Sequence, residues 1–271
     1  MRHVAVRPCS PALRPLVVSF HYNECELAFA VERILPTGQS HLMVNLDEDE
    51  FRTYSGLECK MVHRRGGAVL AGPHGRCTAL DTNEQRRLIA VEFKLGGAAA
   101  FFRMPMSDVC DQVIGLDDIW GSDGRLVRER LCQTVTLADK FRLLEAMLLE
   151  RLVCRCDPAI TAALKFLEHG ASVTEASSRV GLLPKTFVRR FREQVGLAPK
   201  RLSRVRRMQR ILGSVHSRAS VDWCLVAAEH GYTDQAHLIN DFRDLTGITP
   251  SAYRPSSPQR RNHVPLVAAR S

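Results

Sequence analysis

The chain has 271 residues and a formal net charge of +9, with 45% hydrophobic and 25% charged side chains. This length exceeds the usual single domain, and the apolar share suffices for a real core, so we expect a folded protein of more than one domain. No apolar run approaches the roughly 18 residues of a membrane helix, and the N-terminus lacks the apolar centre of a signal peptide. We therefore expect a soluble, cytoplasmic protein with no membrane partner.

Nine cysteines are scattered along the chain, and no two of them form a Cys-x-x-Cys pair. Since an odd number cannot pair completely, this usage favours free thiols in a reducing compartment over a secreted disulfide framework. Cys154 and Cys156 are separated by one residue, which keeps a thiol sensor open as a hypothesis, although buried, inert thiols are the favoured interpretation.

The positive charge is concentrated in the C-terminal part of the chain. Residues 158–254 hold 15 Lys and Arg against 8 Asp and Glu, whereas residues 1–157 hold 20 against 21. Within that part, residues 158–215 carry 12 basic and 3 acidic side chains, and residues 216–254 carry 3 and 5. A local basic excess favours a polyanion, such as nucleic acid, as the partner of this part.

Residues 1–105 are predicted to form short β-strands with Gly- and Pro-rich turns between them. Apolar and β-branched side chains mark five strands, at 16–22, 29–35, 41–45, 68–70 and 87–93. Turn signals such as Pro36-Thr37-Gly38 separate them. Several short strands at this spacing indicate a small β-barrel or a β-sandwich. Of the two we expect the barrel, so the expected fold class is α+β: a small β-barrel, a helical linker and an all-α C-terminal domain.

Residues 106–157 are predicted to be the helical linker. Its longest helix, 137–155, carries apolar residues three or four apart, as an amphipathic helix requires. They are Leu137, Phe141, Leu144, Leu148 and Leu152. Packing of this stripe on the chain's own β domain is the favoured interpretation. The alternative is the interface of a homodimer, and we expect a homodimer that this helix partly holds together.

Residues 158–254 are predicted to be helical throughout. Ser172-Val173-Thr174-Glu175 matches a capping box, in which the Ser and Glu side chains satisfy free backbone groups at a helix start. Pro184 suits the first turn of another helix, and a long basic helix is expected from about Pro199 to Leu212. The tail, residues 255–271, is rich in Pro, Ser and Arg, and it is predicted to be disordered and basic.

The helical region contains one arrangement twice. The order glycine, apolar anchor, Phe, glycine, proline recurs with spacings that agree within one residue. It is carried by Gly181, Phe187, Phe191, Gly196 and Pro199, and by Gly231, Leu238, Phe242, Gly247 and Pro250. Anchors four residues apart lie on one helix face, so the residues beside them project outward. Each half therefore predicts a helix, a short turn and a second helix, which is helix-turn-helix geometry.

The second half resembles the AraC/XylS family of transcription regulators. The resemblance rests on Val226 to Tyr232, Gln235, Leu238, Phe242, Leu245 to Gly247, Thr249, Pro250, Tyr253 and Arg254. The first half resembles the family through Val180 to Leu182, Phe187, Arg189, Phe191, Gly196, Pro199 and Arg207, whereas Ser177 and Ile211 replace its usual alanines. The resemblance implies a bacterial transcription regulator that binds double-stranded DNA through residues 158–254 and has no catalytic activity. RNA polymerase stays open as a further partner.

By the same resemblance, the second helix of each half enters the major groove. The candidate DNA-binding residues project from these two helices, with one more on the connecting helix: Lys185, Thr186, Val188, Arg189, Arg192, Gln235, Ala236, His237, Asn240 and Arg204. Arg and Lys suit guanine, Gln and Asn suit adenine, and Val suits a thymine methyl. Arg204 is predicted to meet phosphate, while Asp241 and Asp244 would repel phosphate unless they point away.

The N-terminal region resembles the cupin-like sensory domain of one AraC-type subgroup. The resemblance rests on Leu35 to Gly38, His41-Leu42, Gly72 to His74, Val91 to Phe93, Gly96 to Ala98 and Leu116 to Gly121. It implies either binding of a small effector of unknown identity or dimerisation. A cupin enzyme needs a His-x-His pair with a nearby Glu, but Met43 follows His41 at the second position, so we expect no metal and no cofactor.

Two other classes of protein stay open as alternatives. One is a cupin-type metalloenzyme that carries a DNA-binding tail. The other is a DNA-repair methyl acceptor, whose short-spaced four-cysteine zinc cluster the dispersed Cys9, Cys25, Cys59 and Cys77 do not match.

Overall fold

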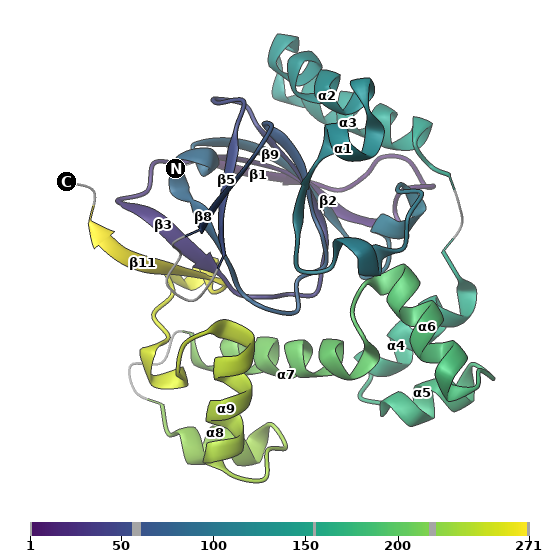
Figure 1. The fold of residues 1–271 in the computed structure, drawn as a ribbon, viewed down its shortest axis with the longest axis vertical. Coiled ribbons are helices and arrows are strands. Elements are labelled where there is room, and N and C mark those ends of the chain that lie inside the picture. Colours follow the sequence, from purple (N-terminus) through teal and green to yellow (C-terminus); the bar gives the residue numbers. More distant parts are fainter. Residues whose placement is uncertain (1, 56–60, 154–155, 217–220, 270–271) are drawn as a thin grey trace.

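The N-terminal part is built from two antiparallel sheets that face each other (Figure 1). The computed structural model of the chain describes residues 2–55, 61–153, 156–216 and 221–269. The six-stranded sheet has the order β1 (Arg2–Val6), β2 (Val17–Glu24), β9 (Arg87–Phe93), β4 (His41–Asn45), β7 (Ala68–Ala71) and β10 (Val113–Gly115). The five-stranded sheet has the order β11 (His263–Ala269), β3 (Phe29–Ile34), β8 (Thr78–Asp81), β5 (Phe51–Ser55) and β6 (Met61–Arg65).

The expectation of a closed barrel is not met. Closure needs continuous strand pairing around the whole circumference, and within the described ranges no strand of one sheet pairs with a strand of the other. The six-stranded sheet ends at β1 and β10, and the five-stranded sheet ends at β11 and β6. The β domain also extends past the expected boundary at residue 105, because β10 pairs with β7.

The six-stranded sheet has two different faces, since successive side chains of a strand point to opposite sides. On β9, Ile89, Val91 and Phe93 join the main hydrophobic core, which α1 (Leu116–Trp120), α2 (Ser122–Gln133) and α3 (Leu137–Glu150) cover. The alternate residues, Ala90 and Glu92, line a cavity between the two sheets instead. The main core therefore lies outside the pair of sheets, and the space between them is left for a cavity.

The apolar stripe of the linker belongs to this core. Three of its side chains on α3 are buried in the main core: Phe141 is 7% exposed, Leu144 is 2% exposed and Leu148 is 1% exposed. The helix ends at Glu150, before Leu152, which is 38% exposed. Packing on the β domain is thus confirmed for the stripe, and its interpretation as a dimer interface is wrong, because the side chains are already buried within the chain.

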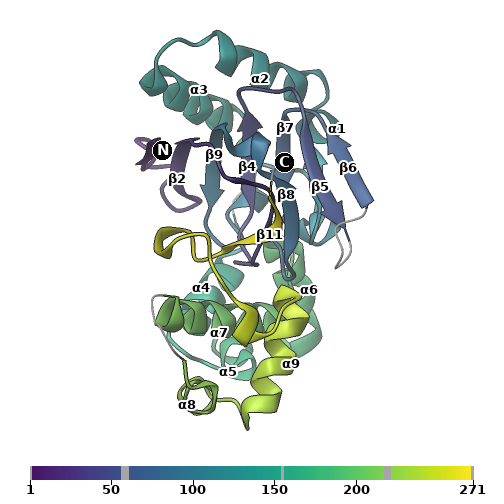
Figure 2. The ribbon, with the colours of Figure 1, turned by 90° about the vertical axis from the view of Figure 1, so that its left-hand side faces the viewer.

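The C-terminal helices follow the predicted order. They are α4 (Pro158–Glu168), α5 (Val173–Arg179), α6 (Pro184–Val195), α7 (Pro199–Val215), α8 (Trp223–Glu229) and α9 (Gln235–Thr246). The capping box of Ser172 and Glu175 forms at the start of α5. In Figure 2, α6 and α9 lie on the same side of α7. Within the described residues, none of the helices has the length and apolar character that crossing a bilayer requires.

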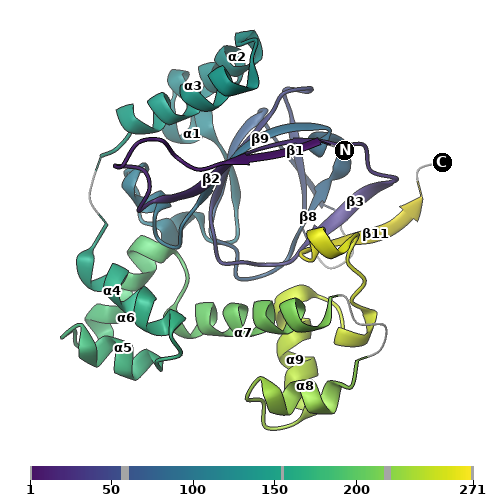
Figure 3. The same ribbon diagram turned by 180° about the vertical axis from the view of Figure 1, so that it is seen from behind.

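The tail is ordered over residues 257–269, so the prediction of a disordered tail is wrong for this segment. After a short 3-10 turn at Pro258–Arg260, β11 pairs antiparallel with β3 (Figure 3). Composition misled the prediction, because the tail's charged and polar residues find partners in the β domain: Arg260 and His263 both contact the buried Glu32.

The position of the stripe in the core predicts a large effect of truncating it. We expect Leu144→Ala to lower the free energy of unfolding by about 2–5 kcal/mol, the range for buried leucines. Leu149→Ala on the same helix is the control. Its side chain is 40% exposed, so we expect a change of about 0.5 kcal/mol or less. Urea denaturation measures both, and equal losses for the two variants would contradict the assignment.

Candidate nucleic-acid interface

The first helix pair, α5 and α6, is held by a small core of its own. Phe187 and Phe191 lie four residues apart on α6 with ring centroids 5.5 Å apart, and Ile160 of α4 packs with them. Gly181 in the turn has φ +67°, which suits glycine. Ser177, which departs from the family's alanine, donates its hydroxyl to the carbonyl of Leu182 at 2.9 Å, so the departure adds a bond to the turn.

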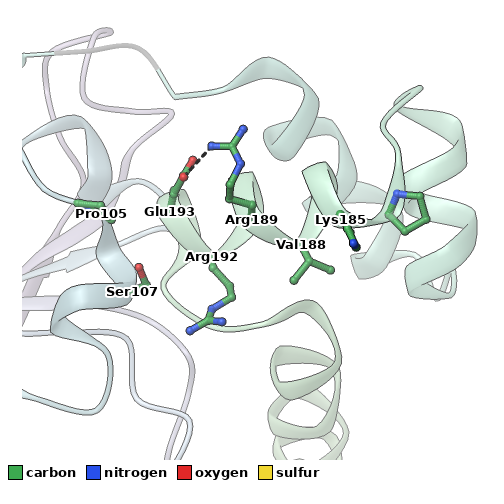
Figure 4. A pocket seen from close by; sticks show the side chains of 8 residues that line it. Pro105, Ser107, Lys185, Val188, Arg189, Arg192 and Glu193 are labelled. Carbon is green, nitrogen blue, oxygen red and sulfur yellow. Dashed lines mark hydrogen bonds and ion pairs between the residues drawn. The ribbon is translucent and has the colours of Figure 1, made fainter.

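The opposite face of α6 carries the predicted contacts of the first half. Lys185, Val188, Arg189 and Arg192 are exposed, and Thr186 is partly exposed. All of them except Thr186 line a shallow groove of about 600 Å³, which Pro105 and Ser107 of the N-terminal part border on its other side. In Figure 4, Val188 and Arg192 point to the groove, whereas Arg189 turns toward Glu193, with which it forms an ion pair at 2.8 Å.

Pro105 and Ser107 were not expected at this site. They lie far from α6 in the sequence, and nothing in their local pattern indicates the contact. The backbone just after α6 packs closely against this segment of the N-terminal part. Gly196 has φ +86°, and a Cβ there would lie 2.2 Å from Pro73 Cγ and 2.8 Å from the carbonyl oxygen of Met106. The end of α6 therefore abuts the β domain.

The second pair, α8 and α9, repeats this construction. Leu238 and Phe242 are buried on α9, and Phe242 makes edge contacts with the rings of Trp223 and Tyr253. Asp234 caps α9 by accepting a hydrogen bond from the backbone N–H of His237 at 2.7 Å. In both pairs, the two apolar anchors four residues apart bury one face of the second helix. The opposite face of α9 is exposed to solvent.

That face holds the predicted contacts of the second half. Ala236, His237 and Asn240 are exposed. Gln235 is partly exposed, and its Oε1 accepts a hydrogen bond from the Cys224 thiol at 3.1 Å. The His237 ring lies edge-on to Tyr232, with centroids 5.1 Å apart. The structure therefore brings these four side chains to one end of α9.

Arg204, which is predicted to contact phosphate, has a structural role that the sequence did not indicate. Its guanidinium donates to Asp241 Oδ1 at 2.5 Å and to Asp244 Oδ2 at 2.6 Å, so it joins α7 to α9. Asp241 is buried and also accepts a hydrogen bond from the Tyr232 hydroxyl at 2.7 Å. The two aspartates therefore pair within the domain and do not present free negative charge to a phosphate.

The ionisation of this cluster follows from its contacts. Burial, the largest effect, would raise the pKa of Asp244, but the hydrogen bond from Arg204 and the charges of Arg201 and Arg204 outweigh it and lower the pKa. Burial and the hydrogen bond to Asp241 raise the pKa of Tyr232. At neutral pH the Asp244 carboxyl is thus ionised, and Tyr232 keeps its phenol proton.

A second site is the cavity between the sheets, with a volume of about 1240 Å³. On its wall His21 Nε2 lies 3.0 Å from Glu92 Oε2, and Gln39 donates to Glu92 Oε1 at 2.9 Å. Burial lowers the pKa of His41 to about 4, so this imidazole is neutral near pH 7. Burial raises the pKa of Glu84 to about 8, so this carboxyl is protonated there.

The cavity wall does not assemble a metal centre in the described part of the chain. There, no three His, Cys, Asp or Glu side chains come close enough together to ligate one ion. Cys156 donates to the carbonyl of Gly96 at 3.4 Å, and Cys154 lies outside the described residues.

The ion pairs of Arg204 with Asp241 and Asp244, here called the Arg204 clamp, predict that replacing Arg204 lowers the stability of the protein and does not only remove a phosphate contact. Arg204→Ala leaves the buried Asp241 without its cation, so we expect the free energy of unfolding to fall by about 3 kcal/mol. Lys200→Ala, which removes one positive charge from the exposed start of α7, is the control and should stay near the wild type. Thermal unfolding without DNA makes the comparison. A fully stable Arg204→Ala protein would contradict the structural role assigned to these ion pairs.

Two family models match the chain: residues 176–256 match a helix-turn-helix domain, and residues 5–115 match a domain of unknown function (DUF6597). No curated protein matches. Similar solved structures include ToxT from Vibrio cholerae, with TM-score 0.46, 8% identity and coverage of 86% of this chain and 97% of that one. They also include ToxT bound to (E)-4-(8-methylnaphthalen-1-yl)but-3-enoic acid, with TM-score 0.47, 8% identity and the same coverage. The resemblance to the AraC/XylS family is confirmed: the chain carries an AraC-type helix-turn-helix domain behind an N-terminal β-sheet domain of unknown function.

Proposed function

We propose that the chain is a sequence-specific DNA-binding transcription regulator, without catalytic activity, that responds to a small effector in the cavity of its N-terminal domain. One observation carries the proposal: within an AraC-type domain, α6 and α9 expose polar and basic side chains on the same side of α7 (Figure 2). The 17 residues of α7 span about 25 Å. Two helix-turn-helix units on such a spacer suit successive stretches of one major groove.

The first unit, α5 and α6, supplies the stronger attraction. Residues 158–215 carry 12 basic and 3 acidic side chains, and phosphate attraction dominates affinity for DNA. On α6, Lys185 and Arg189 suit guanine, and Val188 suits a thymine methyl. The ion pair with Glu193 holds the Arg189 guanidinium at the exposed surface. On binding DNA, the guanidinium leaves Glu193 and donates its hydrogen bonds to a base edge instead.

The second unit, α8 and α9, adds selectivity more than affinity. Residues 216–254 carry 3 basic and 5 acidic side chains, and the Arg204 clamp neutralises Asp241 and Asp244. Gln235 and Asn240 carry the amides that suit adenine. The Gln235 amide nitrogen stays available as a donor, because the bond with Cys224 uses the amide oxygen.

The cavity supports the effector part of the proposal. Its volume of about 1240 Å³ exceeds the ~300–1,000 Å³ of most small-molecule sites, so it has room for such a ligand. Its wall combines apolar side chains with many polar and charged ones, which could orient a ligand that carries both kinds of group. Arg206 and Gln209 of α7 line the same cavity. An occupant would therefore touch the helix that joins the two DNA-binding units, and RNA polymerase is the further partner through which a changed complex would act on transcription.

Within the described ranges, no cluster of metal-ligating side chains favours a cupin-type metalloenzyme or a methyl acceptor. Cys59, one of the four cysteines considered for a methyl acceptor, lies outside the described residues.

The first test of the proposal is DNA binding by the full chain. Fluorescence anisotropy against a duplex selected from a random library should give an affinity that falls steeply as salt rises. Arg189→Ala should lose about 1–3 kcal/mol of discrimination against random duplex. Arg179→Ala removes the same charge from the exposed surface of α5 and is the control. It should weaken both duplexes equally. Binding that ignores salt, or equal discrimination by both variants, would refute the proposed role of α6.

The proposal includes a homodimer, because two protomers double the contacted sequence and raise the effective concentration at paired half-sites. The buried stripe of α3 does not supply the interface. We expect sedimentation velocity to give a dimer on DNA that carries two copies of the selected site, with cooperative binding. Independent binding of single protomers to the two copies would remove the dimer from the proposal.

A further inference from the structure

The C-terminal strap, residues 257–269, connects the second helix-turn-helix unit back to the β domain. It starts four residues after Tyr253, whose hydroxyl donates to the carbonyl of Arg261 at 2.7 Å, and it then pairs with β3 as β11. Val264 of the strap and Leu35, just after β3, are buried in the same core as Phe242 of α9. The strap therefore shares one hydrophobic core with the second unit.

The strap is anchored by one buried carboxylate. Glu32 is 0% exposed, and its Oε1 accepts bonds from Arg260 at 2.9 Å and Gln85 at 2.6 Å and lies 2.6 Å from His263 Nδ1. Among the described residues, none bonds Glu32 Oε2 or Arg260 Nε, and both atoms are buried. Buried polar groups without partners cost free energy, so the anchor is held less tightly than its number of contacts suggests.

The strap is also a wall of the cavity. Gln259, Arg261, Asn262 and His263 line it together with residues of both sheets, α4 and α7. Gln209 of α7 donates to the side chain of Asn262 at 2.9 Å and to the carbonyl of Pro36 at 2.8 Å. In the described part of the chain, β11 of the strap is an edge strand that pairs only with β3.

We propose that the strap is the gate of the cavity, and that its opening admits a ligand and at the same moment loosens the second helix-turn-helix unit from the β domain. Opening breaks the pairing of β11 with β3, withdraws Arg260 from Glu32 and removes Val264 from the shared core. This inference rests on the proposed function for the cavity as a ligand site, but neither the opening nor the loosening depends on DNA or on the identity of the ligand.

Two thiols report on the gate. Cys25 is buried beneath the strap, with its Sγ 3.8 Å from Arg260 Nη1. Ala90→Cys places a second thiol on the cavity wall. The experiment measures alkylation of each thiol by N-ethylmaleimide, with peptide mass spectrometry, in the full chain with and without Glu32→Gln. Glu26→Gln is the matched control, because Glu26 lies next to Cys25 on the exposed surface and does not touch the strap.

We expect Glu32→Gln to raise both alkylation rates about tenfold, since the loss of a bond to a buried charge shifts the opening equilibrium by about this factor. Glu26→Gln should leave both rates at the wild-type value. Amide hydrogen exchange should rise in β3 and across residues 223–246 together, and stay unchanged in α5 and α6, which report on the intact fold. A chain that ends at Ser256 should behave like Glu32→Gln and replaces it if that variant fails to fold.

An unchanged rate at the thiol of Ala90→Cys would overturn the gate, even if Cys25 reacts faster. Faster exchange in β3 alone, with residues 223–246 unchanged, would overturn the coupling to the second unit. In either case the proposed function stands as long as the same protein discriminates its selected duplex from random DNA, so the two failures are distinguishable.

Discussion

The buried face of α7 constrains the rest of the molecule. Leu202 belongs to the core of the first helix pair, while Val205, Met208 and Ile211 belong to the core of the second. Because one continuous helix supplies both cores, the two pairs cannot change their separation unless α7 bends or one core breaks. The Arg204 clamp adds a polar restraint between α7 and α9. A fixed separation is what reading two stretches of one duplex requires.

The same helix meets the β domain on another side. A Cβ on Gly38 would lie 2.7 Å from Leu202 Cδ1, and Arg201 donates to the carbonyl of Gly75 at 2.9 Å. The cavity, α7 and the strap thus form a continuous set of contacts from the sheets to the second unit. These packed side chains join the cavity wall to the proposed DNA-binding face, so the proposed response to an effector requires no contact that the fold lacks.

Local sequence signals predicted the helical half well. The capping box, Pro184 and the positive-φ glycines marked helix ends, because these signals act within one turn. The strands at 41–45 and 87–93 were predicted with the bounds they have. The sequence did not reveal β1, β5, β6, β8, β10 or β11. The partners of β8, β10 and β11 are distant in the sequence, so no local pattern marks these strands or the sites that depend on them. Arg204, Pro105 and the strap acquire their roles only from contacts across the fold, which no local pattern encodes.

The central claim is that α6 and α9 bind one face of one duplex. Hydroxyl-radical footprinting of the full chain on its selected duplex tests it most directly, because protection reports which backbone positions the protein covers. The account predicts two protected patches on the same face of the DNA, about one helical turn or ~34 Å apart. The patch under α9 should disappear first when Asn240 and Gln235 are replaced by alanine. A single patch, or two on opposite faces, would contradict the account.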